Sequence, residues 1–232
     1  MHKQISILFV LVFFIACSST KNISNNTFSH RGVKLTTDSG VIILRLYNKT
    51  PLHRDNFIKL VKQHYFDSVL FHRVIQYFMI QGGDPVSKNA KAGILLGNGG
   101  PKYTIPAEFD TSLFHKKGVL AAAREGDNIN PAKASSGSQF YIVQGKKFTD
   151  HGLDSVEKFR LKGRKLPLSH REIYKTIGGA PHLDMNYTVF GEVLSGLEVV
   201  DKIAATPRDS NNRPLHDIRM QMKLIKIRRD EK

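Results

Sequence analysis

The sequence is short of cysteine and has no tryptophan. Its 232 residues contain one cysteine, Cys17. A single cysteine cannot form a disulfide within the chain. A chain of this length can nevertheless bury a core that needs no covalent staples. We therefore expect one domain with short appendages.

Metal-ligand spacings are also missing from the sequence. The composition is 41% hydrophobic and 24% charged, which excludes a disordered chain and a multi-span membrane protein. The ten histidines show no spacing typical of a metal site. We expect neither a metal nor any other cofactor.

The charge is strongly of one sign, with a formal net value of +15. Lys and Arg are spread along the chain, which favours a solvated surface. A second interpretation is attraction to anionic lipid head groups, acidic glycans or nucleic acid. Nucleic acid is the weakest of these partners, because the sequence has no basic helix with interleaved aromatics. We expect no nucleic acid to bind.

The N-terminal stretch has the pattern of a targeting segment. Lys3 precedes an apolar run over residues 5–15. This run is too short for a membrane span, which takes roughly twenty residues, but it suits a signal-peptide core. Cys17 follows at its end. The arrangement resembles the lipobox of bacterial lipoproteins, although Phe14 stands where Leu is more usual.

That resemblance implies cleavage just before Cys17 and lipidation of its thiol. The alternative is an ordinary secreted chain in which Cys17 is incidental. We divide the chain into a lipoprotein signal peptide (1–16), the lipidated Cys17 with a flexible Ser/Asn-rich tether (17–31), and a folded domain (32–230).

Hydrophobic periodicity predicts many short strands and two helices in the domain. Thr50 and Pro51 mark the start of one helix, with the threonine hydroxyl expected to cap it. The second helix is expected over 197–205. This rhythm is typical of a single closed sheet and not of a βαβ protein. The predicted strands are 33–46 (a hairpin), 68–74, 78–81, 119–123, 139–143, 187–193 and 218–227.

One segment, residues 145–180, does not fit that rhythm. It is charged and helix-prone, and Ser169 to Glu172 form a capping-box pattern. Gly178 and Gly179 provide a stop signal. We interpret the segment as a helical insertion.

Two stretches carry the residues best suited to chemistry. Residues 66–85 contain Arg73, Gln81 and large apolar side chains, and residues 135–142 lead a small-residue loop into a strand with Gln139 and Tyr141. No nucleophile is paired with a base, and no acid cluster occurs. Such a set can hold an apolar peptide and place one cation against it, but it is poorly equipped for hydrolysis.

These stretches resemble the signatures of the cyclophilin family of prolyl isomerases. The matching runs are FHRVI (71–75) with FMIQGGD (78–84), GSQFYI (137–142) and VFGEV (189–193), in the family's order. The resemblance implies a mainly β fold, namely a closed eight-stranded antiparallel β-barrel capped by two α-helices. It also implies peptidyl-prolyl cis-trans isomerase activity.

The resemblance further assigns roles to residues. Arg73 would donate to the prolyl nitrogen, and Gln81 would hold Arg73 and the substrate carbonyl. The apolar pocket for the proline ring would be formed by Phe78, Met79, Tyr141 and Leu183. The remaining substrate-binding residues would be Gln139, His182 and Tyr187, together with the backbone near Ala123 and Arg124.

Four positions depart from the usual family pattern. Arg124 replaces a common Asn, and Tyr141 stands where Phe is frequent. His182 occupies the place of a Trp that lines the groove in many members, and Tyr187 stands where they often carry His. We expect catalysis to survive these changes. Affinity for cyclosporin, which depends on that Trp, is in doubt.

The leading hypothesis is a monomeric isomerase that acts on proline-containing unfolded or flexible segments during folding of exported proteins. The alternative is a non-catalytic peptide-binding chaperone or scaffold on the same fold. A third reading, a surface lectin or lipid-A binder, depends on charge alone. We expect localisation in the cell envelope, on the periplasmic face of an outer membrane, because Ser18 is not an acidic retention signal.

Lipidation of Cys17 can be tested by mass. The Cys17→Ser variant should lose the acyl adduct and should release the domain from membranes, because serine offers no thiol for the lipid. Mass spectrometry and membrane fractionation are the measurements. An adduct of unchanged mass on the variant would contradict the assignment.

Overall fold

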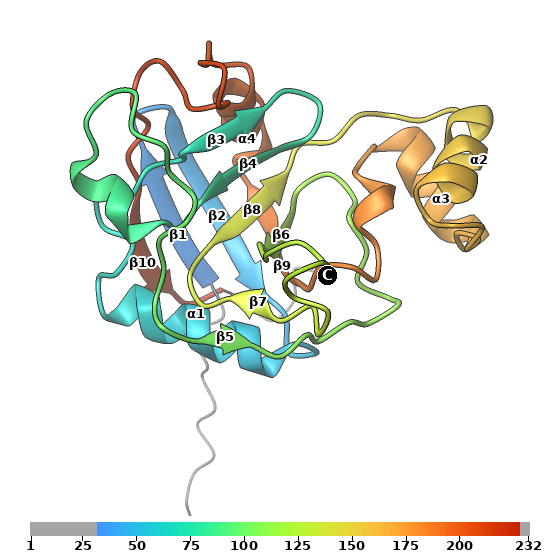
Figure 1. The fold of residues 1–232 in the computed structure, drawn as a ribbon, viewed down its shortest axis with the longest axis horizontal. Helices are drawn as coiled ribbons and strands as arrows, with labels where there is room; N and C mark the ends of the chain where they lie inside the picture. The colour runs from blue at the N-terminus through green and yellow to red at the C-terminus, as the bar shows by residue number, and fades with distance from the viewer. Residues whose placement is uncertain (1–31, 228–232) are drawn as a thin grey trace, which may run out of the picture.

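An eight-stranded antiparallel sheet organises the domain (Figure 1). The structure is a computed structural model that describes residues 32–227. The predicted signal peptide (1–16), Cys17 and the tether (17–31) lie outside the described residues, so these predictions stay open. The sheet order is β10-β1-β2-β9-β6-β8-β4-β3, and β5 and β7 form a separate pair.

The elements have the following bounds. The strands of the large sheet are β1 (Gly32–Thr37), β2 (Gly40–Leu46), β3 (Arg73–Ile75), β4 (Met79–Gly82), β6 (Val119–Ala122), β8 (Phe140–Val143), β9 (Val189–Ser195) and β10 (Gln221–Ile225). The short pair is β5 (Thr104–Ile105) and β7 (Ser135–Ser136). The helices are α1 (Pro51–Lys62), α2 (Asp150–Phe159), α3 (Leu168–Thr176) and α4 (Leu197–Ala204), with 3-10 turns at η1 (Pro85–Asn89) and η2 (Pro181–Leu183).

The sheet is an open half-barrel, so the expected closed barrel is wrong. Its edge strands, β3 and β10, are not paired by a ladder. The chain segments before them meet at one isolated bridge, between Leu70 and Arg219. Three backbone hydrogen bonds join residues 68–71 to residues 218–220, but within the predicted strand 68–74 a regular ladder begins only at Arg73. Only three residues remain for β3, too few to continue the ladder around to β10.

The two predicted barrel helices are confirmed as α1 and α4, which lie at opposite ends of the sheet (Figure 1). Helix α1 begins at Pro51, as expected, but its predicted hydroxyl cap is wrong. The Thr50 hydroxyl is buried and has no hydrogen-bond partner among the described residues. The N–H groups of Leu52 and His53 donate instead to the Glu108 carboxylate, both at 3.0 Å, and Pro51 fixes φ at the first helical position.

The pleat of the strands separates two apolar clusters. On β8, Phe140 and Ile142 enter the main core beneath α1 and α4. Tyr141 and Val143 point to the opposite face, into a second cluster that also contains Met79 and Leu183. Alternate residues of a strand face opposite sides of a sheet, so a single strand supplies both the core and the groove surface.

The helices predicted within residues 145–180 are present as α2 and α3, and they form a lobe on the right in Figure 1 that we call the insertion. It has its own small core of Leu153, Leu161, Leu166 and Tyr174. The buried Glu157 carboxylate accepts from Lys165 Nζ and Arg171 Nη1, both at 2.8 Å. The predicted capping box is wrong, because the N-cap residue of α3 is Pro167. No helix between residues 32 and 227 has the length and hydropathy to cross a membrane.

Phe140 anchors the main core and provides a test of it. Its ring makes edge-on contacts with Phe57 at 5.5 Å and Phe66 at 5.6 Å between centroids. Phe140→Ala should lower the free energy of unfolding by about 3–5 kcal/mol, because it leaves a cavity. Phe159→Ala is the matched control, since that ring is 71% exposed. Urea denaturation should separate the two variants; equal losses would contradict the assignment.

Candidate active site

The strand register places the central polar residues in one row. Arg73 on β3 pairs with Gln81 on β4, and Gln81 pairs with Tyr141 on β8. Directly paired residues of an antiparallel sheet lie on the same face, with Cβ atoms about 5 Å apart. Residues separated by up to 68 positions in the sequence therefore meet on the groove face.

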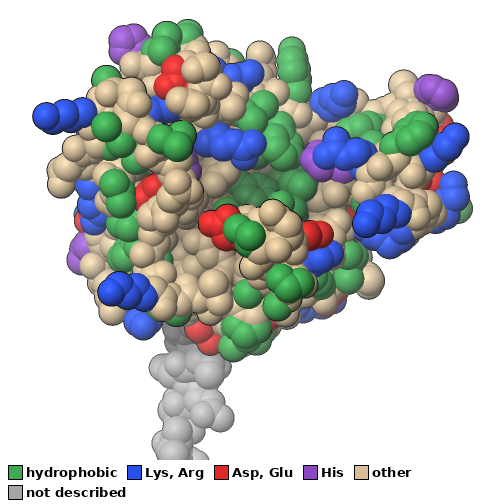
Figure 2. Space-filling model, in the orientation of Figure 1, with side chains coloured by type: hydrophobic (Ala, Val, Ile, Leu, Met, Phe, Trp, Pro, Cys, Tyr) green, Lys and Arg blue, Asp and Glu red, His purple; other side chains and the backbone are tan. Residues whose placement is uncertain are grey.

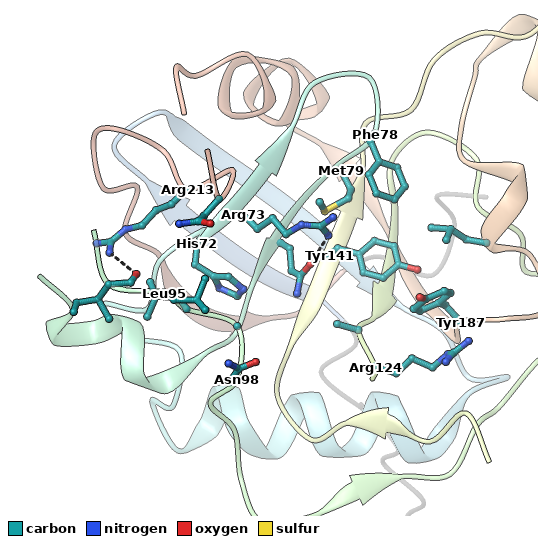
Figure 3. A pocket seen from close by; sticks show the side chains of 17 residues that line it. His72, Arg73, Phe78, Met79, Leu95, Asn98, Arg124, Tyr141, Tyr187 and Arg213 are labelled. Atoms are coloured by element: carbon teal, nitrogen blue, oxygen red, sulfur yellow. Dashed lines mark hydrogen bonds between the residues drawn. The ribbon is translucent and has the colours of Figure 1, made fainter. Parts of the chain in front are cut away.

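A cavity of about 310 Å³ opens beside this row. Figure 2 shows it as a hollow with hydrophobic side chains at its bottom, between the body of the domain and the insertion. Its lining comes from β3, β4, β8, the loop over residues 94–98, and segments around residues 124, 183 and 212 (Figure 3). The predicted residues that line it are Arg73, Phe78, Met79, Gln81, Ala123, Arg124, Tyr141, Leu183 and Tyr187.

The apolar part of the cavity is rigidly packed. Met79, Tyr141 and Leu183 are 1%, 4% and 8% exposed and belong to the second apolar cluster, against which Phe78 also packs. A cavity of this kind buries a small apolar ring and gains about 25 cal/mol for each Å² removed from water. The structure thus brings together all four residues predicted for the proline pocket.

A relay of amide groups holds Arg73. The Arg73 Nη1 donates to Gln81 Oε1 at 3.1 Å, and Gln81 Nε2 donates to Gln139 Oε1 at 3.2 Å. The Gln139 Nε2 then donates to the carbonyls of Gly97 and Gly99, at 2.7 and 2.8 Å. In each amide the oxygen accepts from the residue on the Arg73 side, and the nitrogen donates to the next acceptor away from Arg73. All hydrogen bonds of the relay therefore run in one direction.

Gln139 therefore lies behind the cavity, outside its lining. Its predicted contact with substrate stays a prediction. Both ends of its side-chain amide already make hydrogen bonds in the relay. Its position supports the loop over residues 97–99 and, through Gln81, the guanidinium of Arg73.

Arg73 keeps unused hydrogen-bond donors at the cavity. Between residues 32 and 227 its side chain bonds only to Gln81, and no carboxylate pairs with it. Partial burial lowers the pKa of Arg73 from its ordinary value. Guanidinium groups nevertheless stay protonated in proteins. The site thus presents a permanent, half-desolvated cation beside an apolar pocket.

Arg124 presents its backbone to the groove, while its side chain folds back. The guanidinium donates to the Asn186 carbonyl at 2.7 Å and lies 4.5 Å from the centre of the Tyr187 ring. It also forms an ion pair with Asp127 at 2.7 Å. The neighbouring Ala123 uses its N–H and its carbonyl within the fold, bonding to Gln139 and Ser136.

His182 is not part of the cavity lining, although it was predicted to bind substrate. Its ring packs against Phe78, with centroids 5.4 Å apart. Burial, aided by the positive charge of Arg160, lowers the pKa of His182 to about 4. A neutral imidazole therefore supports the Phe78 wall from behind at neutral pH.

Sequence reasoning missed part of the cavity. No substrate role was predicted for His72, Asn211 or Arg213, yet all three line the cavity together with residues 94–98. Arg213 donates to the carbonyls of Lys91 and Ile94 and thereby ties this loop to the C-terminal segment. No local pattern signals such contacts, because they join segments about 120 residues apart. No group of His, Cys, Asp or Glu within residues 32–227 could hold a metal ion.

Comparisons with known proteins agree with this geometry. A family model described as "Cyclophilin type peptidyl-prolyl cis-trans isomerase/CLD" matches residues 32–223. A protein of Staphylococcus aureus (strain USA300), provisionally named a peptidyl-prolyl cis-trans isomerase, is 34% identical over 187 residues, covering 80% of this chain and 87% of the relative. A bifunctional phosphatase/peptidyl-prolyl cis-trans isomerase of Streptococcus pyogenes, also provisionally named, is 33% identical, and the match spans only 38% of its length.

Two solved structures share the fold. A cyclophilin-type isomerase from Cryptosporidium parvum superposes with a TM-score of 0.60 at 23% identity, covering 83% of this chain and 95% of the other. The same protein in the presence of the dipeptide Ala-Pro gives a TM-score of 0.61 at 22% identity, covering 84% and 98%.

The chain belongs to the cyclophilin-type peptidyl-prolyl cis-trans isomerase family. The enzyme class expected from the sequence signatures is thereby confirmed.

The buried His72 provides a pH test of the site. Its ring is 4% exposed, and neither nitrogen has a hydrogen-bond partner among the described residues. Burial lowers the pKa of His72 to about 4. Between pH 7 and 5 the unfolded chain binds a proton that the folded chain does not, so stability should fall by about 2 kcal/mol through this residue.

Urea denaturation at pH 7 and pH 5 measures that loss. His72→Gln should have a smaller loss of stability between the two pH values than the wild type. His216→Asn, at an exposed position, should keep the wild-type loss. An unchanged loss in His72→Gln would contradict the assignment.

Proposed function

We propose that the groove accelerates exchange of X-Pro bonds between cis and trans, with Arg73 as the catalytic donor. The observation that carries the proposal is that a half-buried guanidinium, with no ion-pair partner within residues 32–227, lies beside an apolar cavity lined by Met79, Tyr141 and Leu183. The proline ring occupies the cavity, and this places the prolyl nitrogen beside Arg73.

The barrier explains why a donor is needed there. Rotation about a peptide bond costs about 18–20 kcal/mol, because the nitrogen lone pair is shared with the carbonyl. The two X-Pro isomers differ by only about 1 kcal/mol, so the reaction is limited by rate. As the bond twists, the lone pair returns to the nitrogen. A donor aimed at this atom stabilises the transition state more than either isomer.

Arg73 suits this role because it is fixed before substrate arrives. The relay through Gln81 and Gln139 orients the guanidinium with hydrogen bonds of 3.1 and 3.2 Å. A preorganised donor in a partly water-excluded site costs no reorganisation during the reaction. Gln81 holds the substrate carbonyl as well as Arg73, so the carbonyl and the nitrogen of the twisting bond are gripped by neighbouring residues.

The groove continues from the pocket along an unpaired stretch of backbone. The N–H and carbonyl of Arg124 make no hydrogen bond to any part of the described chain. An extended peptide can pair with them and thereby align its proline with the cavity. A related fold solved in the presence of Ala-Pro supports a proline-containing ligand for this groove.

The cellular role extends this proposal. The Cys17 lipobox pattern supports a lipid anchor in the cell envelope, on the periplasmic face of an outer membrane. Clients there are proline-containing segments of exported proteins that are still folding. Isomerisation needs no ATP, so the reaction suits that compartment.

The Arg73→Ala variant tests the mechanism directly. It should lower kcat/KM for an X-Pro peptide by about 100-fold, the typical effect of removing one transition-state donor. Peptide affinity should change little, because the apolar pocket remains. Arg73→Lys should recover only part of the activity, since an ammonium lacks the planar fork. NMR exchange spectroscopy measures both exchange and binding.

Arg219→Ala is the matched control, because Arg219 is absent from the cavity lining. It should keep the wild-type rate. A wild-type domain without activity, or Arg73→Ala with full activity, would sink the mechanism. The second result would favour a peptide-binding module that does not use the cation.

A further inference from the structure

A line of four buried polar side chains connects the insertion to the floor of the groove. It begins at Tyr174 on α3 and passes through Asp184 and His115 to Tyr141. Tyr174 and His115 are 0% exposed, and Asp184 and Tyr141 are 4% exposed. Only Tyr141 lines the cavity.

The direction of each hydrogen bond in this line is fixed by chemistry. A carboxylate only accepts, so Tyr174 donates to Asp184 Oδ2 at 2.7 Å and the His115 Nδ1 donates to Asp184 Oδ1 at 2.9 Å. The His115 backbone N–H donates to the same Oδ1 at 2.8 Å. In the neutral imidazole, a donor at Nδ1 leaves Nε2 as the acceptor, and it lies 3.0 Å from the Tyr141 hydroxyl. Burial raises the pKa of both tyrosines, so both hydroxyls stay donors.

Burial makes this line sensitive to the loss of any member. A buried polar group that loses its partner costs about 1–3 kcal/mol, because no water replaces the hydrogen bond. Without the Tyr174 hydroxyl, Asp184 Oδ2 loses its donor and the carboxylate gains freedom to rotate. His115 is hydrogen-bonded to the other oxygen of that carboxylate, Oδ1. Rotation of the carboxylate would therefore also move the His115 ring.

Asp184 also anchors a second wall of the groove. It directly follows Leu183, which lines the cavity, and its carbonyl accepts from the Arg164 guanidinium of the insertion at 2.5 Å. The His115 ring stacks against the Tyr141 ring with an interplanar angle of 16°. The insertion thus contacts one wall through the backbone and the floor through His115.

We propose that Tyr174, Asp184 and His115 are positioning residues that fix the Tyr141 ring in the pocket floor, so that docking of the insertion sets how tightly the groove holds proline. This inference rests on the proposed isomerase activity for its kinetic readout. It assigns the insertion a role in substrate binding, separate from the donor chemistry of Arg73.

A double-mutant cycle tests the coupling. Tyr174→Phe should lower kcat/KM for an X-Pro peptide by about fivefold, within the range for residues that share one network. The change should fall on KM more than on kcat, because the pocket and not the donor is altered. In the Tyr141→Phe background the same substitution should have no effect, since the ring is no longer tied to His115. Tyr103→Phe, away from the cavity lining, is the control.

A purely structural role of Tyr174 predicts a different outcome. Loss of packing in the insertion would lower kcat/KM equally in both backgrounds, and such a result would overturn the proposal. Wild-type kcat/KM in Tyr174→Phe would overturn it too. If Tyr174→Phe does not fold, His115→Gln replaces it in the same cycle, because the amide removes the ring between Asp184 and Tyr141.

A second readout is independent of activity. The buried Tyr141 hydroxyl should give an NMR proton signal that is shielded from water, assigned by its loss in Tyr141→Phe. Tyr174→Phe should change the chemical shift of this signal. An unchanged chemical shift would contradict the proposed coupling between Tyr174 and Tyr141. If the wild-type protein were inactive, the proposed function would fail, and this measurement would still decide the coupling.

Discussion

The alternation of side chains along the strands is the constraint on which the rest of the structure depends. On β8, Phe140 must enter the main core, because it packs against the rings of α1 and the strands around it. Its neighbour Tyr141 must then face the groove. A shift of one residue in register would exchange the two faces and destroy core and pocket together. The position of the pocket floor is thus set by the demands of the core.

The same register determines where the Arg73 cation, the proposed catalytic donor, lies. Arg73 and Gln81 are paired residues of β3 and β4, so the relay requires no special loop conformation at its first step. Only at Gln139 does it leave the sheet, to reach the carbonyls of Gly97 and Gly99. A carboxylate in place of these amides would attract Arg73 more strongly and compete with the prolyl nitrogen. Neutral amides orient the guanidinium and leave its charge available.

Sequence motifs predicted the row of pocket residues well, because the register joins short runs that are each recognisable. Arg73, Gln81 and Tyr141 all line the cavity as expected. The loop over 94–98 and Arg213 were missed, because tertiary contacts between distant segments bring them there. The closed barrel was wrong because β3 has only three residues and meets the segment before β10 through isolated backbone hydrogen bonds, not through a ladder. Capping by Thr50 was wrong because the first N–H groups of α1 donate to the Glu108 carboxylate, which comes from a distant segment of the chain.

The departures from the usual family pattern lie together on one side of the groove. His182 supports Phe78, while Tyr187 packs edge-on against Tyr141 and under Arg124. The four departures contact one another or belong to the segment that leads out of the insertion. They are Arg124, Tyr141, His182 and Tyr187. The opposite side, with Arg73 and the amide relay, matches the family motifs. In the proposed mechanism, changes confined to one side leave the geometry of the Arg73 donor intact and alter the surface that would contact the flanking peptide. The insertion and the unusual side chains are therefore best understood as one packed unit.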